Sequence, residues 1–121
     1  MKLRLLLADD HKLFRHGLRS MLESQKGIEI IAEAGDGPGA VKLAAELQPD
    51  IVLMDVSMPD LNGIEATRKI IADHPAIKVI MLSMHSDRRY ITEALRSGAR
   101  GYLLKDSAFE EVVAAIRDCM N

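Results

Sequence analysis

The sequence predicts an α/β fold, a doubly wound five-stranded parallel sheet with five helices on its two faces. Five short apolar runs alternate with five stretches of helical periodicity. The first and third runs, residues 3–8 and 51–54, are almost wholly apolar, which is typical of strands covered on both faces. No linker, repeat or low-complexity tract interrupts the alternation, so right-handed crossovers should join the strands. We expect one domain over residues 1–121.

The composition is that of an ordinary globular protein, with 48% hydrophobic and 28% charged residues. A formal net charge of -2 gives no bulk field that would attract nucleic acid or an anionic membrane. The single cysteine, Cys119, cannot form an internal disulfide, and the N-terminus lacks the layout of a signal peptide. No apolar run approaches the roughly 20 residues that span a bilayer. We expect a cytoplasmic protein with no membrane partner.

The first strand, residues 3–8, leads into a helix at residues 11–24 with one apolar and one basic side. Gly27 ends this helix, and a second strand follows at residues 28–34. The apolar side consists of Phe14, Leu18, Met21 and Leu22, and the opposite side of Lys12, Arg15, His16, Arg19 and Glu23. We expect the basic side to be exposed.

The second helix begins at Pro38, which suits the first position of a helix, and Pro49 stops it. The third strand, residues 51–54, delivers Asp55 to the turn before Gly63. An acidic side chain is therefore expected where a buried strand ends.

The second half of the chain repeats the pattern with a helix that begins near Ile64 and ends near His74-Pro75, followed by a strand at residues 79–82. The next helix, residues 87–96, has a thin apolar stripe, and Gly98 closes it. Because this stripe anchors it weakly, the helix is a candidate moving part. The remaining elements are a fifth strand at residues 101–104 and a last helix that begins with the capping box of Ser107 and Glu110.

Acidic side chains follow the first and third strands. Asp9 and Asp10 come directly after the first strand and Asp55 after the third, and the carboxyl ends of parallel strands share one edge, where ligands bind. Two carboxylates about 5 Å apart repel by roughly 3 kcal/mol at an effective dielectric constant of about 20, and a hard cation removes that cost. The pattern predicts a Mg²⁺ or Mn²⁺ site. The alternative is that Asp10 caps the first helix and Asp9 is solvated.

Asp55 is either a third metal ligand or a nucleophile, because carboxylates form aspartyl-phosphate intermediates. Lys105, after the fifth strand, and Ser83, after the fourth, favour the nucleophile, since an incoming phosphoryl group needs its oxygens neutralised. Each of these two residues alone is more often a solvated residue or a helix cap. We interpret His11 and His85 as loop or surface histidines, because their spacing does not indicate a metal site.

These residues carry a resemblance to a known family across essentially the whole chain. The set of Asp9-Asp10, Asp55 followed by Met58-Pro59 and Gly63, Ser83, and Lys105 resembles the receiver domain of bacterial two-component response regulators. Residues 98–106, Gly-Ala-Arg-Gly-Tyr-Leu-Leu-Lys-Asp, resemble the NarL/FixJ (LuxR-type) subgroup of transcriptional regulators. The resemblance implies a flavodoxin-like sheet with strand order 2-1-3-4-5.

The resemblance also implies the function, a phosphorylation-activated switch of a two-component system. Asp55 would accept a phosphoryl group from a sensor histidine kinase, and Lys105 would bind the phosphate. The resemblance further implies a Mg²⁺ site formed by Asp9, Asp10, Asp55 and the Ser57 carbonyl, and a switch pair of Ser83 and Tyr102. The chain would be no enzyme beyond self-phosphorylation and autodephosphorylation. It would form a homodimer on phosphorylation and reach DNA only through an output domain that is absent from this chain.

Three rival functions share parts of this pattern. A haloacid-dehalogenase-type Mg²⁺ phosphatase also phosphorylates an aspartate, but it needs a second acid two residues later, where this chain has Ser57. A flavodoxin-like FMN carrier needs a phosphate loop after the first strand, where Asp9 and Asp10 would repel the phosphate. A degenerate receiver that only binds a partner is disfavoured because no site residue is missing.

Overall fold

The computed structural model describes residues 2–58, 62–84, 88–106 and 109–120. The elements in order are β1 Leu3–Ala8, α1 Lys12–Glu23, β2 Ile28–Ala34, α2 Gly37–Leu47, β3 Ile51–Asp55, α3 Gly63–Asp73, β4 Lys78–Ser83, α4 Arg88–Arg96, β5 Gly101–Leu104 and α5 Phe109–Cys119. These bounds are close to the predicted ones. Asp87 and Ser107, which were expected to begin the last two helices, lie outside the described residues. Among the described residues, no helix combines the length and apolar character needed to span a bilayer.

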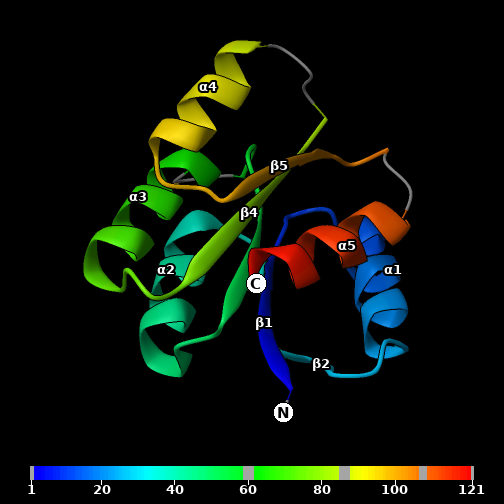
Figure 1. The fold of residues 1–121 in the computed structure, drawn as a ribbon. Helices are drawn as coiled ribbons and strands as arrows, with labels where there is room; N and C mark the ends of the chain where they lie inside the picture. Colours follow the sequence, from blue (N-terminus) through cyan, green and yellow to red (C-terminus); the bar gives the residue numbers. More distant parts are fainter. Residues whose placement is uncertain (1, 59–61, 85–87, 107–108, 121) are drawn as a thin grey trace.

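The strands form one parallel sheet in the order β2-β1-β3-β4-β5. Figure 1 shows α1 and α5 on one face of this sheet and α2, α3 and α4 on the other. The predicted doubly wound fold is confirmed, including the strand order that the resemblance implied. Because all strands run in one direction, their carboxyl ends meet at a single edge.

Two apolar cores lie between the sheet and its helices. β1 contributes Leu5 and Leu7 to the core under α1 and α5, and Leu6 and Ala8 to the core under α2 and α3. Every residue of β3 is buried, from Ile51 through Asp55. Both faces of the two central strands are therefore covered, as their apolar sequences predicted.

β2 contains a bulge that changes which side chains face which core. Its register with β1 shifts between Leu5 and Leu6, so that Ile31 is passed over. Ile30, before the bulge, joins the core under α1 and α5, whereas the two alanines after it face the core under α2 and α3. Glu33 lies between these alanines and therefore faces α1.

The predicted basic side of α1 is only partly exposed. Arg15 Nε donates a hydrogen bond to Glu33 Oε1 at 2.7 Å, and Arg19 also binds Glu33. Although burial opposes it, hydrogen bonds from the two guanidinium groups lower the pKa of the Glu33 carboxyl. Lys12 and His16 are exposed as predicted, but the prediction is wrong for Arg15, whose side chain is only 14% exposed because it reaches β2.

Two helices leave large apolar side chains partly exposed. α4 buries Ala94 but leaves the Leu95 side chain 50% exposed. α5 buries Val112 and Ile116 but leaves Phe109 45% exposed. α4 packs against β5 at the edge of the sheet, so few strands lie beneath it to cover a wider stripe. The expectation that this helix is thinly anchored is therefore confirmed.

Candidate functional site

Two buried carboxylates share one buried ammonium at the carboxyl edge of the sheet. Asp9 follows β1, Asp55 ends β3 and Lys105 follows β5. Lys105 Nζ lies 2.8 Å from Asp9 Oδ2 and 3.3 Å from Asp55 Oδ2, and the three side chains are only 3–4% exposed. The structure thus brings together three of the predicted site residues that the sequence spreads over nearly the whole chain.

The Asp55 carboxyl group is destabilised in its ionised form. Burial, together with the charge of Asp9, raises the pKa of Asp55 from 3.8 to about 6, against the opposing effects of Lys105 and of a hydrogen bond from Ser57. The Ser57 N–H donates to Asp55 Oδ1 at 3.3 Å. Asp55 Oδ2 has an ion pair with Lys105 but no hydrogen-bond partner among the described residues. The negative charge of the ionised Asp55 carboxylate is therefore poorly stabilised by its surroundings.

Asp9 is fixed through both its main chain and its side chain. Arg15 Nη1 donates to the Asp9 carbonyl oxygen at 2.5 Å, and the His11 N–H donates to Asp9 Oδ1 at 2.8 Å. The same arginine binds Glu33 on β2, so α1, β1 and β2 are tied together beside the site. The position of Asp9 consequently depends on this side-chain network as well as on the sheet.

Gly63 allows the first turn of α3 to pack directly on the end of β3. Its N–H donates to the Val56 carbonyl oxygen at 2.8 Å. A Cβ atom at this position would lie 2.0 Å from the Asp55 carbonyl oxygen, which no side chain tolerates. The predicted turn between Asp55 and Gly63 therefore has a steric cause, while Pro59 lies outside the described residues.

Ser83 and Tyr102 lie on the adjacent strands β4 and β5. Ser83 is 1% exposed, and its carbonyl oxygen accepts a hydrogen bond from the Lys105 N–H at 2.8 Å. It follows Leu82, which pairs with Asp55 across β3 and β4. Tyr102 is partly buried against the core under α2 and α3. The sheet therefore places Ser83 one residue beyond the neighbour of Asp55, with Tyr102 on the strand outside it.

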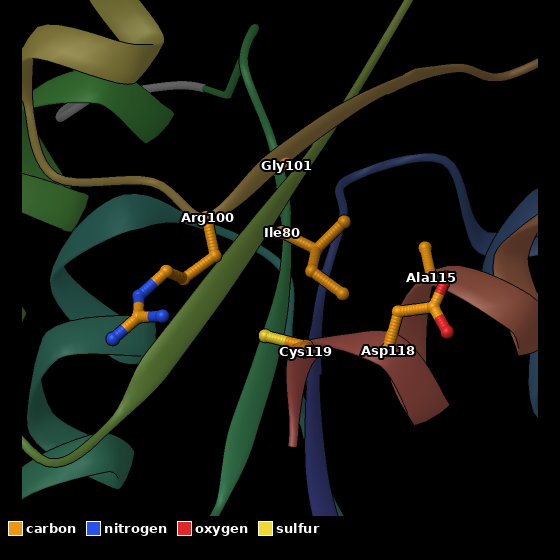
Figure 2. Close-up of a pocket in the computed structure, with 6 residues that line it drawn as sticks. All are labelled: Ile80, Arg100, Gly101, Ala115, Asp118 and Cys119. Carbon is orange, nitrogen blue, oxygen red and sulfur yellow. The ribbon is translucent and has the colours of Figure 1, made fainter. Parts of the chain in front are cut away.

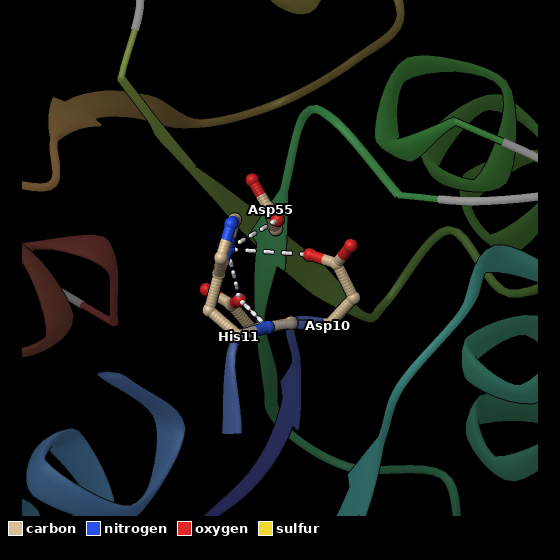
Figure 3. A group of neighbouring side chains, drawn as sticks. Asp10, His11 and Asp55 are labelled. Atoms are coloured by element: carbon tan, nitrogen blue, oxygen red, sulfur yellow. Dashed lines mark hydrogen bonds and ion pairs between the residues drawn. The ribbon is translucent and has the colours of Figure 1, made fainter. Parts of the chain in front are cut away.

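His11 lies over the acid cluster, which the sequence analysis did not anticipate. Its Nδ1 atom is 3.1 Å from Asp9 Oδ1, 3.2 Å from Asp10 Oδ1 and 3.8 Å from Asp55 Oδ2 (Figure 3). His11 also occupies the N-cap of α1 without a side-chain capping bond, so the alternative that Asp10 caps this helix is wrong. The sequence feature that could have indicated this position is that His11 comes directly after the acid pair and directly before the helix. His85 lies outside the described residues.

The donor set suits a divalent cation. One oxygen each from Asp9, Asp10 and Asp55, together with His11 Nδ1, lie within 4.8 Å of one another. In a six-coordinate shell with bonds of about 2.1 Å, opposite ligands are about 4.2 Å apart, so a single ion can reach all four atoms after small adjustments. The Asp10 side chain is 34% exposed, which leaves an open side for water ligands.

A second hollow lies at the opposite edge of the sheet and contains different chemistry. Figure 2 shows Ile80 between Arg100 and Asp118, with Cys119 below it in the view. These four residues help to line a pocket of about 260 Å³. Burial raises the pKa of the Cys119 thiol, although Arg100 opposes this shift. The thiol is therefore protonated at neutral pH, and the acid cluster lies at the other edge.

Comparison with known families identifies the chain. Residues 5–117 match the family described as the response regulator receiver domain. The chain is a response regulator receiver domain. The site residues described above lie within the matched range.

Individual relatives agree with this assignment. The receiver domain is 41% identical over 116 residues to the transcriptional regulatory protein DegU of Brevibacillus brevis, an alignment covering 96% of this chain and 49% of DegU. It is 46% identical over 115 residues to the response regulator UvrY of Escherichia coli K12, covering 95% and 53% of the two chains. The receiver domain therefore spans about half the length of these curated relatives.

A solved structure confirms the fold. A two-component response regulator of the LuxR family from Aurantimonas sp. superposes with a TM-score of 0.93 at 38% identity, covering 98% of the receiver domain and 84% of that chain. The predicted fold class and the predicted membership of the NarL/FixJ (LuxR-type) response regulators are both confirmed.

Proposed function

We propose that Asp55 accepts a phosphoryl group from the phosphohistidine of a sensor histidine kinase. The observation that carries the proposal is the buried Asp55 carboxylate, 3.3 Å from Lys105 and clustered with two further acids. In the transfer, an Asp55 oxygen forms the new bond to phosphorus while the phosphorus–nitrogen bond breaks, and the imidazole leaves with its electron pair. Because the pKa of Asp55 is about 6, the carboxylate is largely ionised at neutral pH and needs no general base.

Asp9 and Asp10, with Asp55 and the Ser57 carbonyl, would hold Mg²⁺ or Mn²⁺. Clustered carboxylate oxygens support this proposal, because hard divalent cations prefer such ligands. A bound ion would neutralise charge on the transferring phosphoryl oxygens. Lys105 would neutralise a further oxygen, and its Nζ lies 4.8 Å from the centre of the Phe14 ring, which helps to hold it at the site.

The direct test uses acetyl phosphate as the donor and intact-mass spectrometry as the measurement. We expect one phosphoryl group per parent chain with Mg²⁺, and none in EDTA or in Asp55→Asn. Asp73→Asn is the matched control, since this exposed aspartate lies at the end of α3. Labelling of Asp55→Asn, or full labelling in EDTA, would overturn the proposal. Sustained turnover of a phosphomonoester would favour a phosphatase instead.

The kinase would dock on the exposed part of α1 beside the site. The Leu13 side chain is 89% exposed, and its neighbour Lys12 and the following His16 are exposed as well. Lys12→Glu combined with Leu13→Ala should slow transfer from the kinase about tenfold, the loss expected for one lost contact patch of about 1.4 kcal/mol. Labelling by acetyl phosphate should not change. Equal losses with both donors would place the damage in the site itself.

Ser83 and Tyr102 would couple phosphorylation to a homodimer. A Ser83 hydroxyl bonded to the phosphoryl group would open space beneath β4 into which Tyr102 turns, which would change the surface beside α4. A bond worth about 1 to 3 kcal/mol in one state shifts the population ratio roughly 5- to 150-fold. Ser83→Ala labelled to completion should therefore dimerise less than the labelled parent in analytical ultracentrifugation. Equal dimerisation would exclude this switch.

The whole regulator would act on transcription through a DNA-binding output domain. This proposal rests on the similarity to DegU, a transcriptional regulatory protein of which the receiver domain covers 49%. The receiver domain would contribute self-phosphorylation and autodephosphorylation and no other enzymatic activity. Full-length regulator should bind its DNA more tightly after phosphorylation, and Asp55→Asn should lose that increase in a gel-shift titration.

A further inference from the structure

The imidazole of His11 points into the acid cluster from outside it. Figure 3 shows its ring nitrogen directed at the carboxylates of Asp10, on the loop after β1, and of Asp55, at the end of β3. The His11 N–H is bonded to Asp9 Oδ1 at 2.8 Å, which fixes the backbone beneath the ring. The ring makes no capping bond to α1, although His11 holds the N-cap position. Its orientation toward the acids is therefore not explained by helix capping.

His11 Nδ1 faces contradictory partners. Two carboxylate oxygens, Asp9 Oδ1 and Asp10 Oδ1, lie 3.1 and 3.2 Å away, and a hydrogen bond to either of them requires a proton on the nitrogen. The Lys105 ammonium lies 3.0 Å away, and a hydrogen bond from it requires a lone pair on the nitrogen. One imidazole nitrogen cannot donate and accept at once. A cation that binds the nitrogen lone pair and the carboxylate oxygens together satisfies the carboxylates, and Lys105 then keeps its ion pairs with Asp9 and Asp55.

The distances agree with ligation of one ion. Adjacent ligands of an octahedral ion with bonds of about 2.1 Å are about 3.0 Å apart. His11 Nδ1 lies at nearly this distance from both Asp9 Oδ1 and Asp10 Oδ1, at 3.1 and 3.2 Å. Its separation of 3.8 Å from Asp55 Oδ2 falls between those of adjacent and opposite ligands. Two of the carboxylates concerned, Asp9 and Asp55, are more than nine-tenths buried, and among the described residues their Oδ2 atoms have ion pairs with Lys105 but no hydrogen bond.

We propose that His11 Nδ1 is a ligand of the divalent cation and gives this receiver domain a preference for Mn²⁺ and later transition metals over Mg²⁺. The inference rests on the metal site proposed above. An imidazole nitrogen is a softer donor than a carboxylate oxygen, so it strengthens binding of transition metals and does little for Mg²⁺. His11 would be a specificity-determining ligand, while the acids supply the charge.

The test is pulsed electron paramagnetic resonance of Mn²⁺ bound to the purified chain, without any phosphodonor. A directly bound nitrogen modulates the electron spin echo of Mn²⁺, whereas oxygen ligands do not. We expect nitrogen modulation in the parent, its loss in His11→Ala, and its retention in His16→Ala. His16 is the matched control because it is an exposed histidine on the same helix. Calorimetric titration should show Mn²⁺ affinity falling about tenfold in His11→Ala and Mg²⁺ affinity falling less than about threefold.

A second variant separates ligation from folding. His11→Asn places an amide oxygen near the position of Nδ1, so it should bind both ions and show no nitrogen modulation. Bound Mn²⁺ without nitrogen modulation in the parent would overturn the inference and leave the acidic metal site intact. Tighter binding of either ion by His11→Ala would also overturn it, because the imidazole would then compete with the ion. Failure of the parent to bind any Mn²⁺ would overturn the metal site as well.

Discussion

β3 and β5 lie on either side of β4 and differ sharply in how they are held. All residues of β3 are buried, whereas no residue of β5 is fully buried. The helix α3, which follows β3, buries residues along its length, while α4 buries only Ala94 among its described residues. The proposed phosphoryl acceptor, Asp55, ends the fixed strand. Tyr102 lies on the loosely covered one and pairs with Met81 of β4, two residues before Ser83.

This difference separates two tasks in space. A nucleophile must keep its geometry, and burial on both faces of β3 holds Asp55 in place. A switch must have two accessible arrangements that differ by little free energy, and such elements come from the less stable part of a structure. The molecule therefore has its proposed phosphoryl acceptor on a central strand and its proposed response at the β5 edge. The following predictions test that division.

The largest single loss of stability should appear when a leucine of β3 is truncated and compared with a leucine of β5. Leu53 in β3 is 1% exposed, whereas Leu103 in β5 is partly buried. Leu53→Ala should lower the free energy of unfolding by about 4 kcal/mol, and Leu103→Ala by about 1.5 kcal/mol, because the second site loses less buried surface and leaves no closed cavity. Urea unfolding measures both. Equal losses would mean that β5 is as firmly packed as β3.

Stability should fall with rising pH because of Asp55. Its pKa in the folded chain, about 6, is above the ordinary value of 3.8, so the folded state holds this proton more tightly than the unfolded state. The resulting stabilisation is present below pH 3.8 and is lost as the pH rises through about 6, by up to about 3 kcal/mol.

The measurement is the difference in stability between the parent and Asp55→Asn, titrated in EDTA. The free energy of unfolding of Asp55→Asn should increase relative to that of the parent as the pH rises from about 4 to about 7. Titrating groups away from Asp55, such as Glu33 with its lowered pKa, are present in both proteins and cancel. If the free energy of unfolding of the parent instead increases relative to that of the variant over this interval, the attraction of Lys105 for the ionised Asp55 carboxylate outweighs the effect of burial.

Two glycines provide a more local contrast. At Gly63, beside the end of β3, an added Cβ would lie 2.0 Å from a main-chain oxygen, whereas at Gly101 in β5 its nearest neighbour would be 3.7 Å away. Gly63→Ala should destabilise the chain by about 3 kcal/mol, and Gly101→Ala by less than about 0.5 kcal/mol. Thermal unfolding at one pH compares them. A tolerated Gly63→Ala would show that α3 can shift away from β3.

The smallest expected effect concerns local opening. Amide hydrogens in α4 should exchange at least about tenfold faster than those in α3, which corresponds to about 1.4 kcal/mol less protection. Hydrogen exchange followed by NMR gives both values in a single sample. Protection of α4 equal to that of α3 would remove the basis for treating the β5 edge as the mobile part.

Local patterns were sufficient to predict the elements. The apolar runs before Asp9 and Asp55 are strands, as expected, and Gly98 has the positive φ of 106° that a helix-ending glycine adopts. Asp36 caps α2 and accepts a hydrogen bond from the Gly39 N–H, so Pro38 occupies the second helical position and not the predicted first. Such errors of one residue arise because a cap is chosen by side-chain geometry as well as by residue type.

Contacts between distant segments could be predicted only where topology forces them. The acids and Lys105 follow parallel strands, so they had to share an edge. The pairing of Arg15 with Glu33 depends on a bulge for which the sequence of β2 has no clear signal. The position of His11 depends on how α1 begins, and residue spacing alone does not determine it.

The bulge at Ile31 has a consequence for how roles are transferred between homologues. Side chains alternate between the two faces of a strand, so one extra residue exchanges the faces of everything after it. Glu33 reaches Arg15 and Arg19 only because of that extra residue. In a receiver that lacks the extra residue, the side chain at the same count from the start of β2 would face α2 instead, and an acid would have to stand one place earlier to face α1. A sequence alignment that places the gap in β2 one position away from the bulge would then assign the contact with the arginines to the wrong side chain of the homologue.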